Sequence, residues 1–397
     1  MKIAYATNFD PSDIHHWSGT GFSIWNSLKK KGVDVDFATS VKLPKSTRLL
    51  LDFKNKFYSR VLKRQFLPDR DLSFAKIHSK EIFIQISKIK NIEAILTPWN
   101  PGVAFVPKGI PLITYSDATF NALINHNAHF KNLCHESRSN GNIIEEAAFN
   151  RASACVFASN WAATSAIRDY NLNPDKVYVV PFGANLQHPP SLEKVKNDII
   201  SRDSGSIKLL FIGVEWERKG GKVAVDITRR LNEMGIPTHL TIIGLSPEIS
   251  LCEKEYVTVQ GFLSKASGGE EHILNELARS HFLIVPSVAE CYGLVYAEAS
   301  ACGVPAIARD VDGVPSVVRN NKNGHRFGLN ASHSEIADWI ANTFRDINEY
   351  RRLALSSRQE YDQRLNWNVA GASLEKIIQK VVLDRKEKDH SKTLYSD

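Results

Sequence analysis

One stretch of the chain, residues 281–318, limits the possible folds more than any other. It opens with an apolar run at 281–287 that has the length of a strand and ends in a Pro and a Ser. Such a run is typical of a buried parallel strand that stops at the edge of a sheet. A short loop with Glu290 follows, and then a helical pattern at 294–302 that ends at Gly303, a residue type that commonly terminates helices. This order predicts an α/β fold with a ligand site at the carboxyl ends of parallel strands.

Two carboxylates, Glu290 and Glu298, flank the start of the predicted helix. The free amides and the partial positive charge of a helix N-terminus favour a phosphate, and carboxylates accept hydrogen bonds from hydroxyl groups. The pair therefore suits a ligand that carries both hydroxyls and phosphate, such as a nucleotide sugar. The spacing alone is also compatible with two solvated Glu side chains beside an ordinary helix.

The residues around this pair follow the pattern P-S-x-x-E-x-Y-G-x-x-x-x-E-A-x-A-C-G-x-P from 286 to 305. This pattern resembles the donor-site signature of the family-4 retaining glycosyltransferases. The resemblance implies the GT-B fold of that family, in which two Rossmann-like α/β/α domains with parallel sheets face each other across a cleft that holds the site. It also implies that Glu290 contacts hydroxyls of the donor sugar and that Glu298 binds the ribose hydroxyls.

The resemblance extends to the loops around the signature. It implies that the backbone amides of Tyr292, Gly293 and Leu294 lie near the diphosphate of the donor. The chain departs from the family at a later loop, where members often carry Gly-Gly and this chain has Asp312 and Gly313. Donor contacts from that later loop are therefore not carried over.

The composition indicates a soluble globular protein. A length of 397 residues predicts two or three domains, and 43% hydrophobic with 23% charged residues is ordinary for such proteins. No apolar run reaches the ~18 residues needed to span a membrane, and the start of the chain lacks the apolar core of a signal peptide. The five cysteines, an odd number without metal-binding spacing, predict reduced thiols in the cytoplasm.

The N-terminal region begins as a βαβ unit. A strand-like segment at 2–7 leads through a polar loop into a helical stretch that opens around Gly19 and Gly21. Glycines let a backbone approach a ligand closely, but this is no dinucleotide fingerprint, because Ile24 stands where the third Gly would be. A plain turn fits the same residues. The family resemblance implies that Gly19 and Gly21 face the donor phosphates and the acceptor.

Residues 42–67 are basic and amphipathic. Apolar residues recur there at helical spacing, and Lys and Arg fill the other side. This pattern is compatible with a helix that lies on an anionic membrane, which would put the protein at the inner face of the membrane, and also with a surface helix packed on its own domain. The net charge of +7 raises nucleic acid as a third partner, but no reading motif accompanies it, and we predict no nucleic-acid binding.

A loop with Asp117 follows the strand predicted at 112–115. In the resembled family the corresponding loop often carries a His or Asp near the donor sugar and the acceptor, which makes Asp117 a candidate catalytic residue. His126 and His129, on the next segment, are competing candidates. A lone Asp after a strand is also a common helix cap.

The chain divides into three predicted parts. Residues 1–190 form an N-terminal, acceptor-binding domain, which ends at a polar run that contains prolines. Residues 191–366 form a domain that binds the nucleotide sugar. Residues 367–397 resemble the GT-B helix that crosses back to the first domain, and they end in a charged tail.

The second domain offers two cations at a strand-to-helix turn. Arg218 and Lys219 follow the strand predicted at 208–213, and two glycines come directly after them. Charge and free amides converge at such a turn and suit a diphosphate, although two solvated side chains fit the same pattern. The family resemblance implies that both residues stabilise the departing diphosphate. It also implies donor contacts at Gly213, where the strand ends, and at Phe262, an apolar side chain beside the base.

Two Asp-Val-Asp triplets, at 34–36 and 310–312, need testing as metal sites. Carboxylate pairs of this form hold a divalent cation in a different glycosyltransferase fold. Here the first falls at a helix-to-strand junction and the second in a loop beyond the helix. Arg218 and Lys219 already provide the charge that a metal would supply. We therefore predict no metal site, and no cofactor, since the nucleotide sugar is a substrate.

Together these features predict a retaining, metal-independent hexosyltransferase of GT-B architecture. It would move a sugar from a UDP- or GDP-sugar to a glycan or lipid-linked acceptor in cell-surface polysaccharide synthesis. Two alternatives stay open: a GT-B epimerase that acts on the nucleotide sugar alone, and a non-catalytic protein that binds the nucleotide sugar. The epimerase would need its own acid and base, for which the sequence offers no clear pair.

Overall fold

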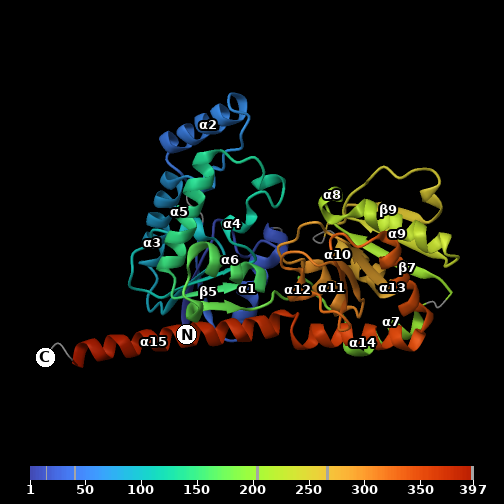
Figure 1. Cartoon of the computed structure of the whole chain (residues 1–397). Helices are drawn as coiled ribbons and strands as arrows, with labels where there is room; N and C mark the ends of the chain where they lie inside the picture. The colour runs from blue at the N-terminus through green and yellow to red at the C-terminus, as the bar shows by residue number, and fades with distance from the viewer. Residues whose placement is uncertain (15, 40–41, 203–204, 265–267, 395–397) are drawn as a thin grey trace. The chain divides into compact units, whose positions relative to one another are not determined.

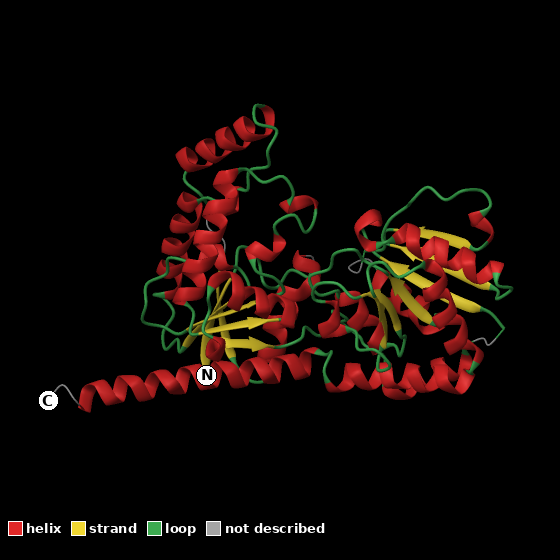
Figure 2. Ribbon diagram, in the orientation of Figure 1, coloured by secondary structure: helices red, strands yellow, loops and turns green. Residues whose placement is uncertain are grey.

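The structure, a computed structural model, describes residues 1–394 except 15, 40–41, 203–204 and 265–267. It divides into two compact units (Figure 1). Unit 1 contains residues 1–180 together with the chain from 370 onwards, and unit 2 contains residues 181–369. Each unit has a central parallel sheet with helices packed around it (Figure 2).

Unit 1 has a sheet with the strand order β2-β1-β3-β4-β5-β6 in the described residues, and every pair is parallel. The order reverses between β1 and β3, and loops at the carboxyl ends of strands form ligand crevices at such reversals. Its strands are β1 (Lys2–Ala6), β2 (Asp34–Ala38), β3 (Ala94–Thr97), β4 (Leu112–Ser116), β5 (Ala154–Phe157) and β6 (Val177–Val179). Its helices are α1 (Thr20–Lys29), α2 (Lys45–Arg60), α3 (Leu72–Ile86), α4 (Phe120–Leu123), α5 (His135–Arg151), α6 (Asn160–Tyr170) and most of α15 (Trp367–Leu394).

Unit 2 has the strand order β12-β11-β10-β7-β8-β9, again with every pair parallel. Here the order reverses between β7 and β10. Its strands are β7 (Ile207–Ile212), β8 (Thr238–Ile243), β9 (Val257–Gly261), β10 (Phe282–Val285), β11 (Ala306–Arg309) and β12 (Gly324–Phe327). Its helices are α7 (Leu192–Ser201), α8 (Trp216–Lys219), α9 (Gly221–Glu233), α10 (Gly269–Arg279), α11 (Leu294–Ala301), α12 (Val314–Val317), α13 (His333–Arg345) and α14 (Ile347–Gln363).

The strand and the helix predicted within 281–318 are present as β10 and α11. All four residues of β10 are buried, because a parallel strand in the middle of a sheet has helices on both faces. The helix ends beside Gly303, which has a left-handed φ of 62°. The signature stretch therefore folds as the strand–loop–helix unit that its pattern predicts.

The unit boundary lies ten residues before the predicted one. Residues 181–190 belong to unit 2 rather than to unit 1. Phe182 explains this shift, since its ring packs inside unit 2 on Tyr292, at 5.4 Å between ring centroids, and on Trp367, at 5.7 Å. The polar run that follows therefore lies within unit 2 and does not mark the boundary.

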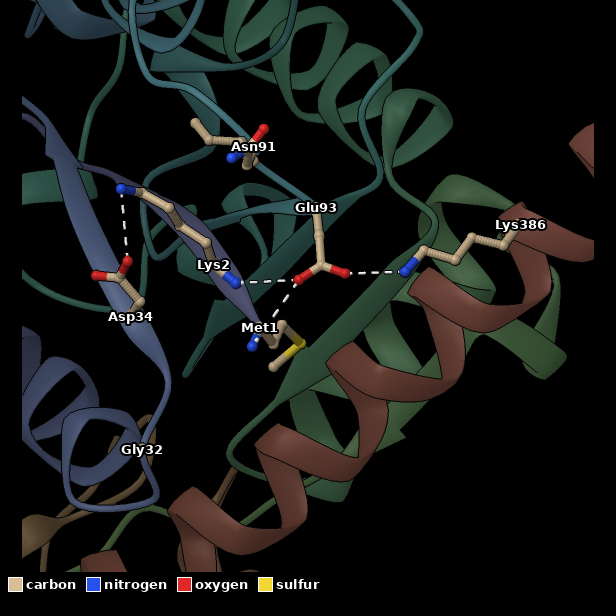
Figure 3. A pocket seen from close by; sticks show the side chains of 8 residues that line it. Met1, Lys2, Gly32, Asp34, Asn91, Glu93 and Lys386 are labelled. Carbon is tan, nitrogen blue, oxygen red and sulfur yellow. Dashed lines mark hydrogen bonds and ion pairs between the residues drawn. The ribbon is translucent and has the colours of Figure 1, made fainter.

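The long helix α15 starts in unit 2 and belongs to unit 1 beyond its first three residues. In unit 1, Lys386 of this helix donates to Glu93 (3.0 Å), which also accepts the backbone N–H of Lys2 (3.1 Å) (Figure 3). The predicted charged tail is helical as far as Leu394, and residues 395–397 lie outside the described residues.

The residues that make these contacts line a pocket at one edge of the unit 1 sheet (Figure 3). Lys2 begins β1, and Glu93 directly precedes β3. The pocket therefore lies at the amino ends of the strands, whereas ligands of open α/β sheets bind at the carboxyl ends. It is therefore not at the edge of the sheet where the candidate site is expected.

Candidate functional site

The candidate site of unit 2 lies at the carboxyl ends of β7 and β10. These two strands are neighbours at the point where the strand order reverses, which is where open α/β sheets bind ligands. Lys219 is the last residue of α8, the short helix after β7, and Glu290 stands in the loop after β10. The fold thus brings two residues that are 71 positions apart to one edge of the sheet.

Lys219 Nζ and Glu290 Oε2 form a hydrogen-bonded ion pair. Both side chains are nearly buried, with exposed fractions of 12% and 10%. Gly213, the residue after β7, packs directly on the lysine, because a Cβ added there would lie 3.1 Å from Lys219 Cγ. Ser287 Oγ is 3.4 Å from the same carboxylate oxygen. A buried charge is costly unless it is paired, so each member of the pair stabilises the other at this position.

Arg218 approaches the same carboxylate from farther away, with 3.7 Å between Nη1 and Glu290 Oε2. Its Nε and Nη2 donate to the carboxylate of Glu215 (2.9 and 2.8 Å), and Nη1 donates to the carbonyl oxygen of Ala289 (2.8 Å). Burial lowers the pKa of Arg218, but the hydrogen bond to Glu215 and the charge of Glu290 raise it, and the net shift is upward. Arg218 is therefore a permanent positive charge held in place by the protein.

Asp312 positions the loop that carries Glu290. Its Oδ2 accepts the backbone N–H of Glu290 (2.9 Å), and the backbone N–H of Gly313 donates to the Glu290 carbonyl oxygen (3.1 Å). The sequence presents Asp312 as a departure from the family pattern and as part of an Asp-Val-Asp triplet, and neither feature predicts its contact with the Glu290 loop. The signal was the close spacing of Asp312 and Gly313, which is typical of a turn that folds back on a neighbouring loop.

The N-terminus of α11 faces the same loop. Gly293 is the residue before the helix, with a φ of 88°, and a Cβ there would lie 2.4 Å from the Tyr296 ring and 3.3 Å from Glu290 Cγ. Glu298 lies on α11 and is buried. The side chain of Tyr292 does not point to the site, since its hydroxyl donates to the Phe182 carbonyl oxygen (2.8 Å). At 292, only the backbone amide is left for the predicted contact with the diphosphate.

Gly220 lets the loop after β10 approach α8 and α9. It has a φ of 73°, and a Cβ there would lie 2.3 Å from the Pro286 carbonyl oxygen. We expect Gly220→Ala to lower the free energy of unfolding by about 2–4 kcal/mol, because a left-handed Ala costs about 1 kcal/mol and overpacking adds about 1–3 kcal/mol.

The matched control for this prediction is Gly235→Ala. Gly235 has a φ of 74°, and a Cβ there would meet nothing within 4 Å. That variant should lose only about 1 kcal/mol, from the backbone conformation alone. Urea unfolding of both variants measures the difference, and equal losses would show that the Pro286 loop can move away from Gly220.

Phe262 directly follows β9, the edge strand of the unit 2 sheet, and is 71% exposed. It lies at the same carboxyl edge as Lys219, with β8 between the two strands that carry them. Leu294 is the first residue of α11, next to Gly293. The unit 2 candidates in these loops therefore lie along the carboxyl edge of the unit 2 sheet, and Phe262 is beside the outermost strand, β9.

Asp117, Gly19 and Gly21 lie in unit 1, after the carboxyl ends of β4 and β1. Asp117 is not the helix cap that the sequence left open, because Thr119 precedes α4 and accepts the backbone N–H of Ala122 (3.2 Å). The competing histidines pack against aromatic rings, His126 on Trp161 at 5.5 Å and His129 on Phe130 at 4.8 Å.

The two glycines of unit 1 differ in their surroundings. Gly19 precedes α1 and has a left-handed φ of 83°. At Gly21 an added Cβ would lie 2.4 Å from the Phe9 ring. The close approach that requires a glycine at 21 is therefore made by the protein's own Phe9.

The two Asp-Val-Asp triplets have structural partners. Lys2 pairs with Asp34 (3.4 Å) and Asp36 (2.9 Å), and Asp310 pairs with Arg326 (3.4 Å). Asp312 holds the Glu290 loop as described above. Within the described residues, no group of three or more His, Cys, Asp or Glu side chains is arranged to hold a metal ion.

Residues 194–360 match the family described as glycosyl transferases group 1. Among similar proteins, the gpi3 subunit of phosphatidylinositol N-acetylglucosaminyltransferase from Schizosaccharomyces pombe is 22% identical over 216 residues, which cover 53% of this chain and 45% of that protein. D-inositol 3-phosphate glycosyltransferase from Rhodococcus erythropolis is 30% identical over 170 residues, which cover 39% of this chain and 38% of that protein. The chain spans less than half the length of these two relatives.

Solved structures share the fold over nearly the whole chain. Sucrose-phosphate synthase from Thermosynechococcus elongatus has a TM-score of 0.67 at 15% identity, covering 96% of this chain and 99% of that one. Anabaena Alr3699/HepE in complex with UDP has a TM-score of 0.61 at 14% identity, covering 96% and 100%. At these identities the likeness concerns the fold alone. Residues 194–360 therefore match the glycosyl transferases group 1 family, and the chain as a whole has the GT-B fold.

Proposed function

We propose that the chain is a retaining glycosyltransferase that moves a sugar from a UDP- or GDP-sugar to a glycan or lipid-linked acceptor in cell-surface polysaccharide synthesis. The observation that carries the proposal is the Lys219–Glu290 pair beside Arg218, at the reversal between β7 and β10. This arrangement joins two positive charges suited to a diphosphate with a carboxylate suited to sugar hydroxyls. It lies within the glycosyl transferases group 1 domain.

In the proposed reaction, the bond between the sugar and the diphosphate breaks, and negative charge grows on the leaving diphosphate. An ammonium group has three N–H donors, and Glu290 engages one of those of Lys219. The others can donate to diphosphate oxygens. Preorganised charge of this kind is often the largest single contribution to catalysis. Arg218 adds a fixed positive charge behind the lysine, because its side chain is held by Glu215 and the Ala289 carbonyl.

The other candidates have proposed roles along the donor. Glu290 contacts the sugar hydroxyls, and Glu298 accepts the ribose hydroxyls. The amides at 292–294 face the diphosphate, since they open α11 and a helix N-terminus favours a phosphate. Phe262 offers an exposed apolar ring to the base. In unit 1, the candidates are Asp117, Gly19 and Gly21, after the carboxyl ends of β4 and β1, and their proposed partner is the acceptor.

The similar proteins support the class of substrate. Two are named for sugar transfer to phosphatidylinositol and to D-inositol 3-phosphate, and one similar structure contains UDP. Another is a glycosyltransferase of lipopolysaccharide biosynthesis. These names favour a nucleotide-sugar donor and an acceptor that is a glycan or carries a lipid. The five cysteines are free thiols, which supports a reducing, cytoplasmic setting.

The test is to incubate the full chain with a panel of UDP- and GDP-sugars, with and without glycan and lipid-linked acceptors, and to measure nucleotide release. We expect release that depends on an acceptor, and a product whose anomeric configuration, determined by NMR, matches that of the donor. Consumption of donor without an acceptor would support an epimerase instead. Tight binding of a donor with no turnover under any condition would support a non-catalytic binding protein.

We expect the transfer reaction to survive treatment with EDTA at close to its full rate. Lys219 and Arg218 supply positive charge at the proposed position of the diphosphate, where a metal would otherwise act. Nucleotide release before and after chelation measures this. Loss of turnover in EDTA with recovery in Mn²⁺ or Mg²⁺ would show that the two cations do not suffice.

A further inference from the structure

Helix α2 is attached to unit 1 along one narrow face. Leu51 is the one buried residue of this helix, and it packs with Phe66 and Cys134. Two polar side chains on the same face hold the helix in place. Lys54 pairs with Asp71 (2.7 Å), and the Tyr58 hydroxyl donates to Glu136 (2.9 Å). The surface-helix interpretation of residues 42–67 accounts for this face.

A second face of α2 is apolar and exposed. Four residues of α2 and two that directly follow it, each between 42% and 68% exposed, make up what we call the α2 apolar face: Leu49, Leu50, Phe53, Phe57, Val61 and Leu62. The rings of Phe53 and Phe57 stack at 6.5 Å, so the face is a continuous surface rather than scattered side chains. A continuous exposed apolar patch of this kind marks an interaction site.

The charge of the chain is concentrated around this face. Residues 42–67 hold eight of the 50 Lys and Arg residues and one of the 43 Asp and Glu residues. The rest of the chain therefore has 42 of each, and the net charge of +7 belongs entirely to this segment. Lys54 pairs with carboxylates, but Lys45, Lys56, Arg60 and Lys63 are exposed and form no ion pair within the described residues.

The position of α2 leaves this charged and apolar surface accessible within its unit. Figure 1 shows the helix beyond the ends of α3 and α5, on the side of unit 1 away from the sheet. At 100° per residue, Lys56 and Arg60 lie beside Phe53 and Leu49 on the helix surface. Basic side chains therefore border the α2 apolar face along its length.

We propose that the α2 apolar face and the basic residues around it bind the surface of an anionic lipid bilayer. Apolar side chains flanked by Lys and Arg match the interface of such a membrane, where acyl chains take the apolar groups and headgroups take the charge. Within the described residues, no helix has the length and apolar character to cross a membrane. The proposed contact is made by exposed side chains on one face of α2.

Other occupants fit this surface less well. A second copy of the chain would set the same cluster of positive charge against itself across a two-fold interface. Nucleic acid would engage the cations, but its interfaces are polar and would leave six apolar side chains without a partner. The proposal goes beyond the proposed function and does not depend on it, since lipid binding is measured without any sugar transfer.

The test is sedimentation of the full chain with vesicles of phosphatidylcholine alone and of phosphatidylcholine with about one third phosphatidylglycerol. We expect the protein to pellet with the anionic vesicles at low salt and to be released at about 1 M salt, where the Debye length is about 3 Å. Equal recovery with neutral and anionic vesicles would overturn the proposal.

Two double variants test the apolar and the basic side chains of this surface in turn. Phe53→Asp with Phe57→Asp should weaken partitioning at least tenfold, since two aromatic side chains lose their place in the bilayer. Lys56→Gln with Arg60→Gln should weaken it about fivefold for each charge removed. All four residues are exposed, so circular dichroism and the melting temperature should be unchanged.

The controls alter matched residues elsewhere. Leu251→Asp replaces an exposed apolar residue of unit 2, and Lys30→Gln with Lys31→Gln removes two exposed charges from unit 1. Both controls should pellet like the unaltered chain, and equal losses in the controls would overturn the proposal. So would light scattering that detects a dimer abolished by Phe53→Asp, because it would assign the face to a second copy. Salt-sensitive binding to duplex DNA without vesicle binding would assign it to nucleic acid.

Discussion

Lys219→Ala is expected to lower kcat by about 10²–10³, because the charge that Lys219 supplies is most valuable when negative charge grows on the leaving diphosphate. KM for the donor should change much less, since the diphosphate carries less negative charge in the ground state, where its bond to the sugar is intact. Steady-state kinetics with saturating acceptor measure both constants. The removal also deprives Glu290 of its direct cation, with Arg218 left at 3.7 Å, so thermal unfolding should be recorded for the same sample.

Lys222→Ala is the matched control. Lys222 lies in the first turn of α9, three residues after Lys219, is 73% exposed and pairs with Asp226 at 3.7 Å. Its removal should leave kcat within about twofold, because an exposed surface ion pair contributes little. A similar loss of kcat in both variants, or a variant of Lys219 that keeps normal turnover while folded, would contradict the role of Lys219 as the diphosphate cation.

Glu298→Gln is expected to lower the affinity of the protein for both the donor and the free nucleotide about ten- to a hundredfold. The change keeps the shape of the side chain but removes the charge proposed to accept two ribose hydroxyls, and a charge-assisted hydrogen bond contributes about 1.5–3 kcal/mol. Ribose is common to the donor and the free nucleotide, so both should lose similar affinity. Titration with the nucleoside diphosphate measures this without turnover.

Glu290→Gln should behave differently, because its proposed partner is the sugar. Free nucleotide should bind this variant normally, while turnover falls. The variant also removes the negative charge beside Lys219, which gives no reason for nucleotide affinity to drop. If Glu290→Gln lost nucleotide binding and Glu298→Gln kept it, the two carboxylates would have the opposite roles.

The GT-B fold and the glycosyltransferase resemblance predicted from the sequence are confirmed. Both could be predicted because both rest on local signals. The run at 281–287 and the helix pattern after it need only neighbouring residues to be recognised. Residues 286–305 contain the whole signature, and the strand and helix that carry it are β10 and α11. Individual candidates such as Lys219 and Glu290 were also available from the sequence, since each stands at the end of a predicted strand.

Contacts between segments that are distant in the chain could not be predicted from the sequence. The pairing of Lys219 with Glu290 requires β7 and β10 to be neighbours, and no local pattern specifies which strands pair. Asp312 holds the Glu290 backbone across a sequence separation of 22 residues. The two compact units divide ten residues before the predicted boundary at 190 for a similar reason, because the packing of Phe182 on Trp367 joins residues far apart in sequence.

The interpretation of residues 42–67 shows where a periodic pattern stops being informative. The pattern predicts an amphipathic helix, and α2 is one. It does not say which apolar residues face the protein, since Leu51 and its neighbour Leu50 are chemically alike. The structure buries the first and leaves the second 47% exposed, and only that difference separates the attached face from the α2 apolar face.

The path of the chain through the two units has a consequence for its synthesis. Unit 2 is a single continuous segment, whereas unit 1 needs α15, whose Leu374 and Ile378 are buried. When the first 180 residues have left the ribosome, unit 1 still lacks this helix and exposes the apolar surface that it covers. Unit 2 can fold while unit 1 waits, although domains usually fold in the order of synthesis. The nascent chain is therefore most exposed to chaperones and to aggregation during the translation of unit 2.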